Sequence, residues 1–330
     1  MTLRLSDKWV WDFWLLQDRD EHHIFYLQAP RALGESPLRH HHASIGHAVS
    51  EDLRTWRLLP DALRPGPAGS WDDLATWTGS AIAHDGRWYM LYTGINRSEL
   101  GLIQRIGLAV SDDLVQWAKH PENPVLEADP RWYDLLDHAR WRDQSWRDPW
   151  LFKHPDDGSI HCLITARSPL GEPDAAGVVG HARSADLLTW EVMAPVTAPG
   201  DFAQVEVPQL VTIDGRHQIL VSAQADDHSR ERIERLGKPG ETGTFVFTSD
   251  ELLGPYRSPT GPIAAPDGPL GTLYAGKLIQ GPAGKLQFLA FRGNGDRDFV
   301  GELTDPLAVT VEPDGQLRVE SQPVPAGANR

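Results

Sequence analysis

Short apolar runs separated by turn residues recur along the whole chain. Five of these runs follow a turn and carry mostly apolar or aromatic side chains, at residues 23–28, 87–93, 159–166, 217–223 and 285–291. The preceding turns contain Asp85-Gly86, Asp157-Gly158, Asp214-Gly215 and Gly284, and residues 18–20 fill that place before the first run. Apolar runs of this length, bounded by glycine and aspartate, are typical of β-hairpins. We therefore expect five hairpins, each ending in its own return strand.

A second pattern follows the return strands. A strand-like segment at residues 45–50 leads into Asp52-Leu53 and Trp56, and the same order recurs from residues 106 and 179, with a weaker copy from residue 244. We expect its Ser and Asp to tie a turn while its Leu and Trp pack between blades. A hairpin with outer strands that repeats at roughly 57 to 72 residues is a propeller blade. The chain is therefore predicted to be all-β, a single five-bladed β-propeller domain over residues 1–330, with blades that begin near residues 9, 77, 146, 205 and 273.

Composition and charge narrow the class of protein. The 330 residues are 40% hydrophobic and include 30 Gly and 26 Pro, which suits a folded chain with many turns. The formal charge is −15, so no basic stripe is available for phosphates, and we expect no nucleic-acid partner. The single cysteine, Cys162, cannot form an internal disulfide and is expected to be buried. Residues 1–8 lack an apolar export signal and no long apolar run follows, so we expect a cytoplasmic protein without a membrane span.

Acidic residues stand on three of the five first strands, where the blades of a propeller converge on one axis. We place Asp12, Asp148 and Glu206 at the same position of blades one, three and four. A buried, unpaired carboxylate costs several kcal/mol, so three together indicate a purpose, although each alone could cap a turn or pair with a nearby Arg. We expect tryptophans to line the same funnel, at Trp11, Trp14, Trp77, Trp146 and Trp150. Sugars stack on aromatic rings and glycosidic bonds are cleaved between paired carboxyl groups, so the pattern favours a glycosidase.

The order of these pieces resembles the catalytic propeller of glycoside hydrolase family 32, which includes invertases, levanases and inulinases. The resemblance covers most of the chain and rests on HHIFYLQAP at residues 22–30, GHAVSEDLRTWRLLPDAL at 46–63, residues 78–94, 106–126 and 301–318, Arg147-Asp148-Pro149 and Glu206-Val207-Pro208. It implies that Asp12 is the nucleophile, that Asp148 stabilises the transition state and that Glu206 is the acid/base. The expected reaction is hydrolysis of β-fructofuranosides, such as sucrose or short fructo-oligosaccharides, with retention of configuration.

The expected contacts with the small carbohydrate substrate come from six further residues: Trp11, Gln28, Trp77, Ser80, Arg147 and Tyr274. We expect no cofactor and no metal ion, and the sequence leaves the oligomeric state open. If Asp12 and Glu206 act as nucleophile and acid/base, their carboxyl groups should stand about 5 to 5.5 Å apart.

Three departures from the family pattern bear on the substrate. Trp11 stands where the family has Asn before the nucleophile, and residues 13–15 replace its Pro-Asn-Gly. Val207 replaces the Cys after the acid/base, and the β-sandwich that usually follows the propeller is expected to be absent. The alternatives are an inverting arabinofuranosidase or xylosidase of the related family 43, a fructosyltransferase, and a propeller that only binds sugar. Arg147 directly before Asp148 favours the family 32 group.

Several loop residues allow more than one interpretation. His40-His41-His42 could hold a metal, contact substrate or be solvated. Asp226-Asp227-His228 could reach the mouth of the funnel or lie in a solvated loop, and residues 230–235 are expected to form a solvated insertion. Residues 132–141 could form a short helix before the third blade, with Arg142 and Asp143 at the rim.

Overall fold

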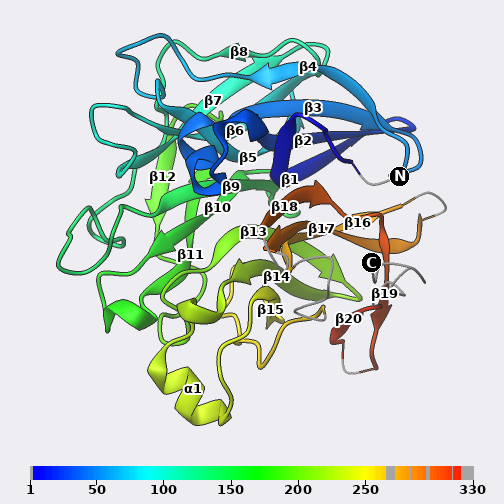
Figure 1. The fold of residues 1–330 in the computed structure, drawn as a ribbon. Helices are drawn as coiled ribbons and strands as arrows, with labels where there is room; N and C mark the ends of the chain where they lie inside the picture. Colours follow the sequence, from blue (N-terminus) through cyan, green and yellow to red (C-terminus); the bar gives the residue numbers. More distant parts are fainter. Residues whose placement is uncertain (1–2, 265–271, 282–283, 295–297, 314, 321–330) are drawn as a thin grey trace.

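The computed structural model describes residues 3–264, 272–281, 284–294, 298–313 and 315–320. Five antiparallel sheets follow one another along the chain and around the molecule (Figure 1). This arrangement confirms the predicted five-bladed β-propeller. The innermost strands form a closed ring, because β1 contacts β5 and β16, β5 contacts β9, β9 contacts β13, and β13 contacts β16. None of the helices in the described part of the chain is long and apolar enough to cross a membrane.

The first three blades each have four strands, joined in the order of the chain. Blade one contains β1 (Lys8–Asp18), β2 (Glu21–Pro30), β3 (Ser44–Ser50) and β4 (Arg57–Leu63). Blade two contains β5 (Ala75–His84), β6 (Arg87–Ile95), β7 (Gln104–Ser111) and β8 (Ala118–Lys119). Blade three contains β9 (Trp146–Lys153), β10 (Ile160–Arg167), β11 (Gly177–Ser184) and β12 (Trp190–Met193).

The last two blades depart from the expected four strands. Among the described residues, blade four has three strands: β13 (Glu206–Ile213), β14 (Arg216–Ala223) and β15 (Gly243–Ser249). A single bridge between Thr248 and Arg257 stands where a fourth strand was expected. Blade five has five strands: β16 (Leu273–Gln280), β17 (Leu286–Asn294), β18 (Phe299–Leu303), β19 (Leu307–Val311) and β20 (Leu317–Val319). The predicted starts of the blades lie within two residues of the observed first strands.

Each innermost strand carries a β-bulge at the same place in its hairpin. The first residues of the five bulges are Asp12, Thr78, Asp148, Val207 and Ala275, and all but Thr78 have a positive φ, at 21°, 57°, 51° and 52°. A bulge adds an unpaired residue and turns the strand, so it redirects side chains at this point. The residues directly before the bulges form a second ring: Trp11, Trp77, Arg147, Glu206 and Tyr274.

The bulges correct one prediction. Glu206 does not occupy the position of Asp12 and Asp148, because it precedes its bulge by one residue and is equivalent to Arg147 and Tyr274. The bulge position of blade four is taken by Val207. The sequence concealed this one-residue offset, because the bulge, and not the spacing of apolar residues, sets the register of each inner strand.

Hydroxyl groups stabilise the bulges from the neighbouring blade. Thr93, Thr165 and Ser222 each lie opposite the residue that precedes the bulge of their own blade. Each accepts the bulge N–H of the following blade: Asp148 N to Thr93 Oγ1 at 3.0 Å, Val207 N to Thr165 Oγ1 at 3.1 Å and Ala275 N to Ser222 Oγ at 3.0 Å. A bulge leaves an N–H without a partner in its own sheet, and a buried N–H needs an acceptor. These contacts therefore join blades two to five in sequence.

The turn after the third strand has the predicted structural role. In blades one, two and three a Ser hydroxyl donates to the Asp carboxylate two residues later, at 2.9, 3.1 and 3.0 Å. The following Leu53, Leu114 and Leu187 have positive φ angles and are buried between blades. Cys162 is buried in β10, as expected.

Arg31 helps to close the ring between the last blade and the first. Its Nη2 donates to the carbonyls of Val300 and Gly301, at 2.9 and 3.2 Å, and its Nε donates to the carbonyl of Lys8 at 3.0 Å. Leu303 N also donates to Leu3 O at 3.1 Å. These contacts join residues from opposite ends of the chain, so the ring closes only when both ends have folded.

Two pairs of buried histidines occupy equivalent places in blades one and three. His23 Nδ1 lies 2.9 Å from His47 Nε2, and His161 Nδ1 lies 2.7 Å from His181 Nε2. A hydrogen bond between two imidazoles needs one donor and one acceptor, so it is lost when both rings are protonated. Burial, followed by the charge of the partner ring, lowers the pKa of His47 and of His181 to about 3.

We predict that these pairs make the fold sensitive to acid. A histidine with a folded-state pKa below its unfolded value of about 6.5 contributes stability above pH 6.5 that is lost as the pH falls. The double variant His47→Gln/His181→Gln should therefore lose less stability than the wild type between pH 7 and pH 5, by about 1 to 2 kcal/mol per histidine. Urea unfolding at fixed ionic strength measures this difference. Parallel stability curves for the two proteins would contradict the prediction.

Candidate active site

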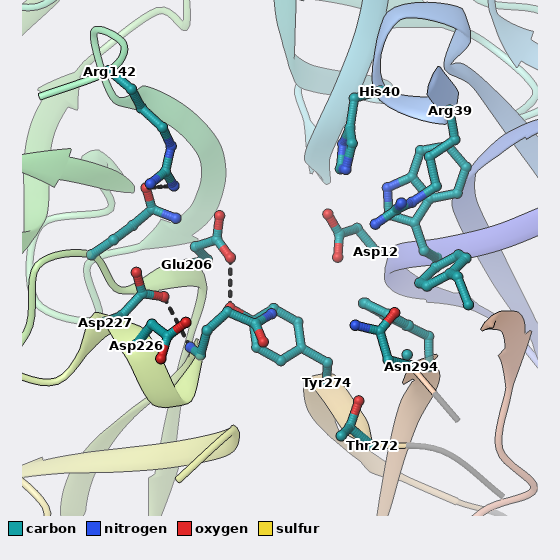
Figure 2. Close-up of a pocket in the computed structure, with 16 residues that line it drawn as sticks. Asp12, Arg39, His40, Arg142, Glu206, Asp226, Asp227, Thr272, Tyr274 and Asn294 are labelled. Carbon is teal, nitrogen blue, oxygen red and sulfur yellow. Dashed lines mark hydrogen bonds between the residues drawn. The ribbon is translucent and has the colours of Figure 1, made fainter. Parts of the chain in front are cut away.

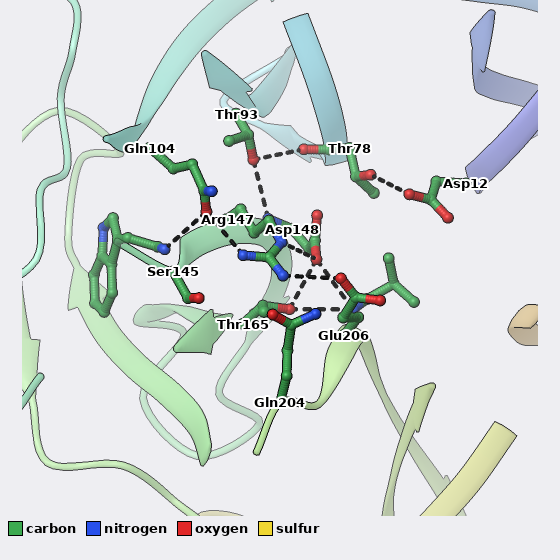
Figure 3. A network of polar contacts seen from close by, with 12 residues as sticks. Asp12, Thr78, Thr93, Gln104, Ser145, Arg147, Asp148, Thr165, Gln204 and Glu206 are labelled. Carbon is green, nitrogen blue, oxygen red and sulfur yellow. Dashed lines mark hydrogen bonds and ion pairs between the residues drawn. The ribbon is translucent and has the colours of Figure 1, made fainter. Parts of the chain in front are cut away.

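The innermost strands surround a pocket at the axis of the propeller. It consists of two adjoining hollows of about 400 and 260 Å³, which share Trp11, Asp12, His40, Arg142 and Glu206. The first also contains Arg39, Asp226, Asp227, Tyr274 and Asn294 (Figure 2). The second also contains Trp77, Thr78, Gln104, Arg147 and Asp148, and Figure 3 shows the polar contacts of the last four. Hollows of this size are in the range of small-molecule sites. Asp12, Asp148 and Glu206 therefore line one continuous cavity.

Asp12 projects from the bulge of β1. Its Oδ2 accepts a hydrogen bond from Thr78 Oγ1 of blade two at 3.3 Å (Figure 3). The pKa of Asp12 is raised from 3.8 to about 7. Burial contributes most to this rise, the charges of Asp148 and Glu206 add to it, and the charges of Arg39 and Lys277 oppose it. A carboxyl group close to two others is harder to ionise, so the charge of Asp12 depends on these nearby cations.

Asp148 lies at the bulge of β9 and is held more firmly. Its Oδ2 accepts hydrogen bonds from Thr165 Oγ1 at 2.8 Å and from Val207 N at 3.2 Å. Burial raises the pKa of Asp148, while Arg147, whose Nε lies 3.7 Å from Oδ2, opposes that rise. These three contacts all use Oδ2, which leaves Oδ1 for a ligand. The carboxyl group is therefore fixed in orientation before any substrate binds.

Glu206 is held by both of its oxygen atoms. Arg147 Nη2 donates to Oε1 at 2.8 Å, and Tyr274 Oη donates to Oε2 at 2.6 Å. Arg147 is itself positioned by Gln104, whose Oε1 accepts from Nη1 at 2.9 Å. Burial and then the charge of Glu206 raise the pKa of Tyr274 well above its usual value, so its hydroxyl remains a donor. The one-residue offset of Glu206 thus places it between two neighbours that bind it.

Comparison with protein families identifies the fold and the site together. Residues 14–255 match the model described as the glycosyl hydrolases family 32 N-terminal domain, which spans Arg147, Asp148 and Glu206. The chain belongs to glycosyl hydrolase family 32. It is therefore a glycoside hydrolase, as the sequence predicted. Asp12 precedes the matched residues, so its assignment rests on its place in the family 32 pocket.

Individual relatives have low sequence identity to this family 32 chain, but their matches cover most of it. The extracellular sucrase of Zymomonas mobilis is 24% identical, over 96% of this chain and 84% of that protein. The sucrose-6-phosphate hydrolase of Bacillus subtilis is 26% identical, over 71% of this chain and 45% of that protein. Among solved structures, the inulosucrase from Halalkalicoccus jeotgali bound to kestose has a TM-score of 0.78 and 25% identity, covering 96% of this chain and 87% of that chain.

The predicted binding residues of the family 32 site divide into two groups. Trp11, Trp77, Arg147 and Tyr274 line the pocket. Gln28 does not, because its amide donates to Asp61 Oδ1 at 2.7 Å within blade one. Ser80 does not either, because its Oγ accepts Leu151 N at 2.8 Å and joins blades two and three. Both side chains lie on strands that lead to the site, but their hydrogen bonds stabilise the scaffold.

The expected row of five tryptophans is also shorter than predicted. Trp11 and Trp77 line the pocket. Trp14 and Trp146 are fully buried in the hydrophobic core, and Trp150 packs against two core clusters. Side chains alternate along a strand, and the bulge changes which of them faces the axis, so most of these rings fill the space between blades.

Two cations near Asp12 were not predicted. Arg39 comes from the 3-10 helix η2 (Ser36–His42) and lines the pocket. Lys277 of β16 is buried, and its Nζ donates to Val207 O at 2.5 Å. Burial lowers the pKa of Lys277 to about 8, against the effects of Asp12 and Asp148. A lysine inside an apolar inner strand was a signal for this site, whereas nothing in the sequence around Arg39 placed its loop over the axis.

The structure places one of the histidines that the sequence left open. His40 lines the pocket, and its ring meets those of Trp11 and Trp77 edge-on. Burial and then Arg39 lower the pKa of His40 to about 3, so its ring is neutral. In the part of the chain that the structure describes, no group of three or more His, Cys, Asp or Glu is placed to hold a metal ion.

Three further loop segments differ in part from what the sequence predicted. Asp226 and Asp227 reach the pocket, and burial followed by the charge of Glu206 raises the pKa of Asp227 to about 6. The expected insertion is the helix α1 (Arg230–Leu236), and Arg232 within it is buried against Asp201 at 3.0 Å. Residues 132–141 form turns and not a helix, because Asp137 Oδ1 accepts from Ala139 N and caps a turn. Arg142 and Asp143 do line the pocket.

We predict that removing the charge of Asp12 stabilises the fold at high pH. Its folded-state pKa lies above the unfolded value, so its burial lowers stability progressively as the pH rises from about 4 to about 7. Asp12→Asn should be about 1 to 3 kcal/mol more stable than the wild type at pH 8, and no more stable at pH 4. Urea unfolding at both pH values measures the difference.

A surface aspartate supplies the control. Hydrogen bonds from the backbone of Thr55 and Arg54 hold the pKa of Asp52 below its usual range. Asp52→Asn should therefore change stability in the opposite direction, by lowering it at pH 8. If Asp12→Asn has the same stability as the wild type at pH 8, the carboxyl group is not destabilised by its surroundings.

Proposed function

We propose that this chain hydrolyses β-fructofuranosides, such as sucrose or short fructo-oligosaccharides, with retention of configuration. The observation that carries the proposal is that Asp12 and Glu206 line one pocket, with Asp148 fixed beside them. Paired carboxyl groups are the minimum that glycoside hydrolysis requires. Membership of family 32 and the sucrase and inulosucrase relatives support this choice of substrate.

In the proposed mechanism Glu206 protonates the oxygen of the leaving sugar while the Asp12 carboxylate attacks the anomeric carbon. The fructosyl unit is then covalently bound to Asp12. Glu206 next removes a proton from water, which attacks the same carbon and releases Asp12. Asp148 accepts hydrogen bonds from the fructosyl hydroxyls through Oδ1 and stabilises the positive charge that develops on the ring. Arg147 and Tyr274 keep Glu206 in place throughout, because each holds one of its oxygen atoms.

Transfer to a second sugar is the alternative that a specific observation favours. The inulosucrase from Halalkalicoccus jeotgali, bound to kestose, shares the fold over 96% of this chain. A covalent fructosyl-enzyme can pass its sugar to water or to another hydroxyl. Chromatography of products at high sucrose concentration separates the two: glucose and fructose in equal amounts support hydrolysis, and an excess of glucose with new oligosaccharides supports transfer. The cytoplasmic location stays a proposal that cell fractionation tests, and the Zymomonas mobilis relative is named an extracellular enzyme.

We predict that the two catalytic carboxyl groups differ in their response to the leaving group. Glu206→Ala should lower turnover of sucrose by about 10²- to 10⁴-fold, the range for general acid catalysis. An aryl β-fructofuranoside needs no proton to depart, so its first step should be largely spared, and azide should then trap the fructosyl unit. Asp12→Ala should remove both activities, because no covalent intermediate can form. Steady-state kinetics on both substrates, with azide added, tests this.

A matched control and product stereochemistry complete the test. Glu191→Gln removes an acid that pairs with Arg183 on the exterior of blade three, and it should keep wild-type rates. NMR of the first product should show the configuration of the substrate. Inverted configuration, or near-normal turnover by Asp12→Ala, would replace the retaining mechanism with the inverting one of family 43.

A further inference from the structure

Arg39 occupies a place in the pocket that the mechanism above does not use. It lies in η2, in the connection between β2 and β3 of blade one, and Figure 2 shows it on the same side of the pocket as Asp12. Its guanidinium is clamped against two aromatic rings, 3.9 Å from the centroid of Phe299 and 5.5 Å from that of Trp11. Its Nη1 donates to Ser36 O at 2.9 Å. The charged group is therefore held in place by blades one and five together.

The Nε of Arg39 has no hydrogen-bond partner among the described residues, although the atom is buried. An N–H donor without a partner in a buried site costs about 1 to 3 kcal/mol, and so it needs an explanation. Proteins usually satisfy such donors with their own carbonyl groups or with a ligand. Because Arg39 lines the sugar pocket, its guanidinium group is placed to bind a hydroxyl there, and the unpaired Nε shows that the protein alone does not satisfy this group.

The charges that face Asp12 give Arg39 a second role. The charges of Asp148 and Glu206 oppose the ionisation of Asp12, and the charges of Arg39 and Lys277 favour it. Thr78 donates a hydrogen bond to Asp12, and the nearby His40 ring is neutral. The other cations of the site are already occupied. Lys277 donates to Val207 O, and Arg147 binds Glu206 and Gln104. Arg142 donates to Gln204. Among the described cations of the pocket, Arg39 is the one with a buried donor to spare.

We propose that Arg39 is a binding and positioning residue of this site: it stabilises the neighbouring Asp12 carboxylate and donates from its guanidinium group to a hydroxyl of the bound fructosyl unit. The inference rests on the proposed function for the identity of the sugar. The planar guanidinium suits both tasks, because its contacts with the rings of Phe299 and Trp11 hold it in place at the wall of the pocket. A lysine at this position keeps the charge but has neither the fork of donors nor the flat face.

The test separates charge from hydrogen bonding with two substitutions. The pH dependence of kcat/KM on an aryl β-fructofuranoside reports the ionisation of the free enzyme, so its acid limb follows Asp12. Arg39→Gln should move that limb upward by about half a pH unit or more, because a positive charge near Asp12 is lost. Arg39→Lys should leave the limb close to that of the wild type. Both variants should raise KM, by about 3- to 10-fold, since each loses the guanidinium donors.

Arg31→Gln is the matched control. Arg31 also belongs to blade one and stacks on a tryptophan, with its guanidinium carbon 5.8 Å from the centroid of the Trp9 ring, but its donors bind backbone carbonyls outside the pocket. This variant should lower the melting temperature without moving the acid limb. If Arg39→Gln behaves in the same way, with an unshifted limb and an unchanged KM, Arg39 only packs the fold and the proposal is wrong. An equal shift in Arg39→Lys and Arg39→Gln would likewise remove the role of charge.

One further measurement keeps the inference separate from the proposed function. If the wild type cleaves no β-fructofuranoside, the proposed substrate has failed. The carboxyl carbon of Asp12 can then be titrated by NMR in the wild type and in Arg39→Gln, which requires no turnover. A higher midpoint in the variant supports the electrostatic role of Arg39, and identical midpoints overturn it.

Discussion

Repulsion among carboxyl groups is the constraint on which the centre of this molecule depends. Asp12, Asp148 and Glu206 line one pocket, and burial together with the neighbouring negative charges raises the pKa of the two aspartates. A buried anion is tolerated only when hydrogen bonds and opposite charges compensate for lost hydration. Each acid has a different compensation: two hydrogen-bond donors for Asp148, an arginine and a tyrosine for Glu206, and for Asp12 one hydroxyl at 3.3 Å together with the charges of Arg39 and Lys277.

This inequality suits the division of chemical roles in the proposed mechanism. Asp148 is the most firmly oriented, which a group that stabilises charge requires. Glu206 is held by two partners that still leave lone pairs open, as proton transfer needs. Asp12 has the fewest contacts, which favours attack on carbon, because a nucleophile tied by many hydrogen bonds is less reactive. The cost falls on stability, as is usual for residues that are placed for function.

The scaffold supports this arrangement through the backbone. Four of the five bulges place a non-glycine residue at positive φ, a conformation that persists only where the surroundings enforce it. For the bulges of blades three, four and five, the hydroxyl groups of Thr93, Thr165 and Ser222 supply that enforcement from the preceding blade. The bulge that exposes Asp148 therefore also connects blade three to blade two. A substitution at one of these hydroxyls affects both the inter-blade contacts and the geometry of the pocket.

The sequence by itself determined the number of blades, their starting points and that Asp12, Asp148 and Glu206 belong to one pocket. Those features repeat, and a repeated pattern of apolar residues, turns and Ser-x-Asp-Leu motifs is visible in one dimension. Only the tertiary structure decided the one-residue offset of Glu206, the burial of Trp14 and Trp146, and the scaffold roles of Gln28 and Ser80. The physical reason is that a bulge changes which side chains of a strand face the axis, and the pattern of apolar residues does not show where a bulge lies. Arg39 lay beyond the reach of the sequence for a related reason, because its loop is placed over the axis by contacts with Trp11 and Phe299 that span the whole chain.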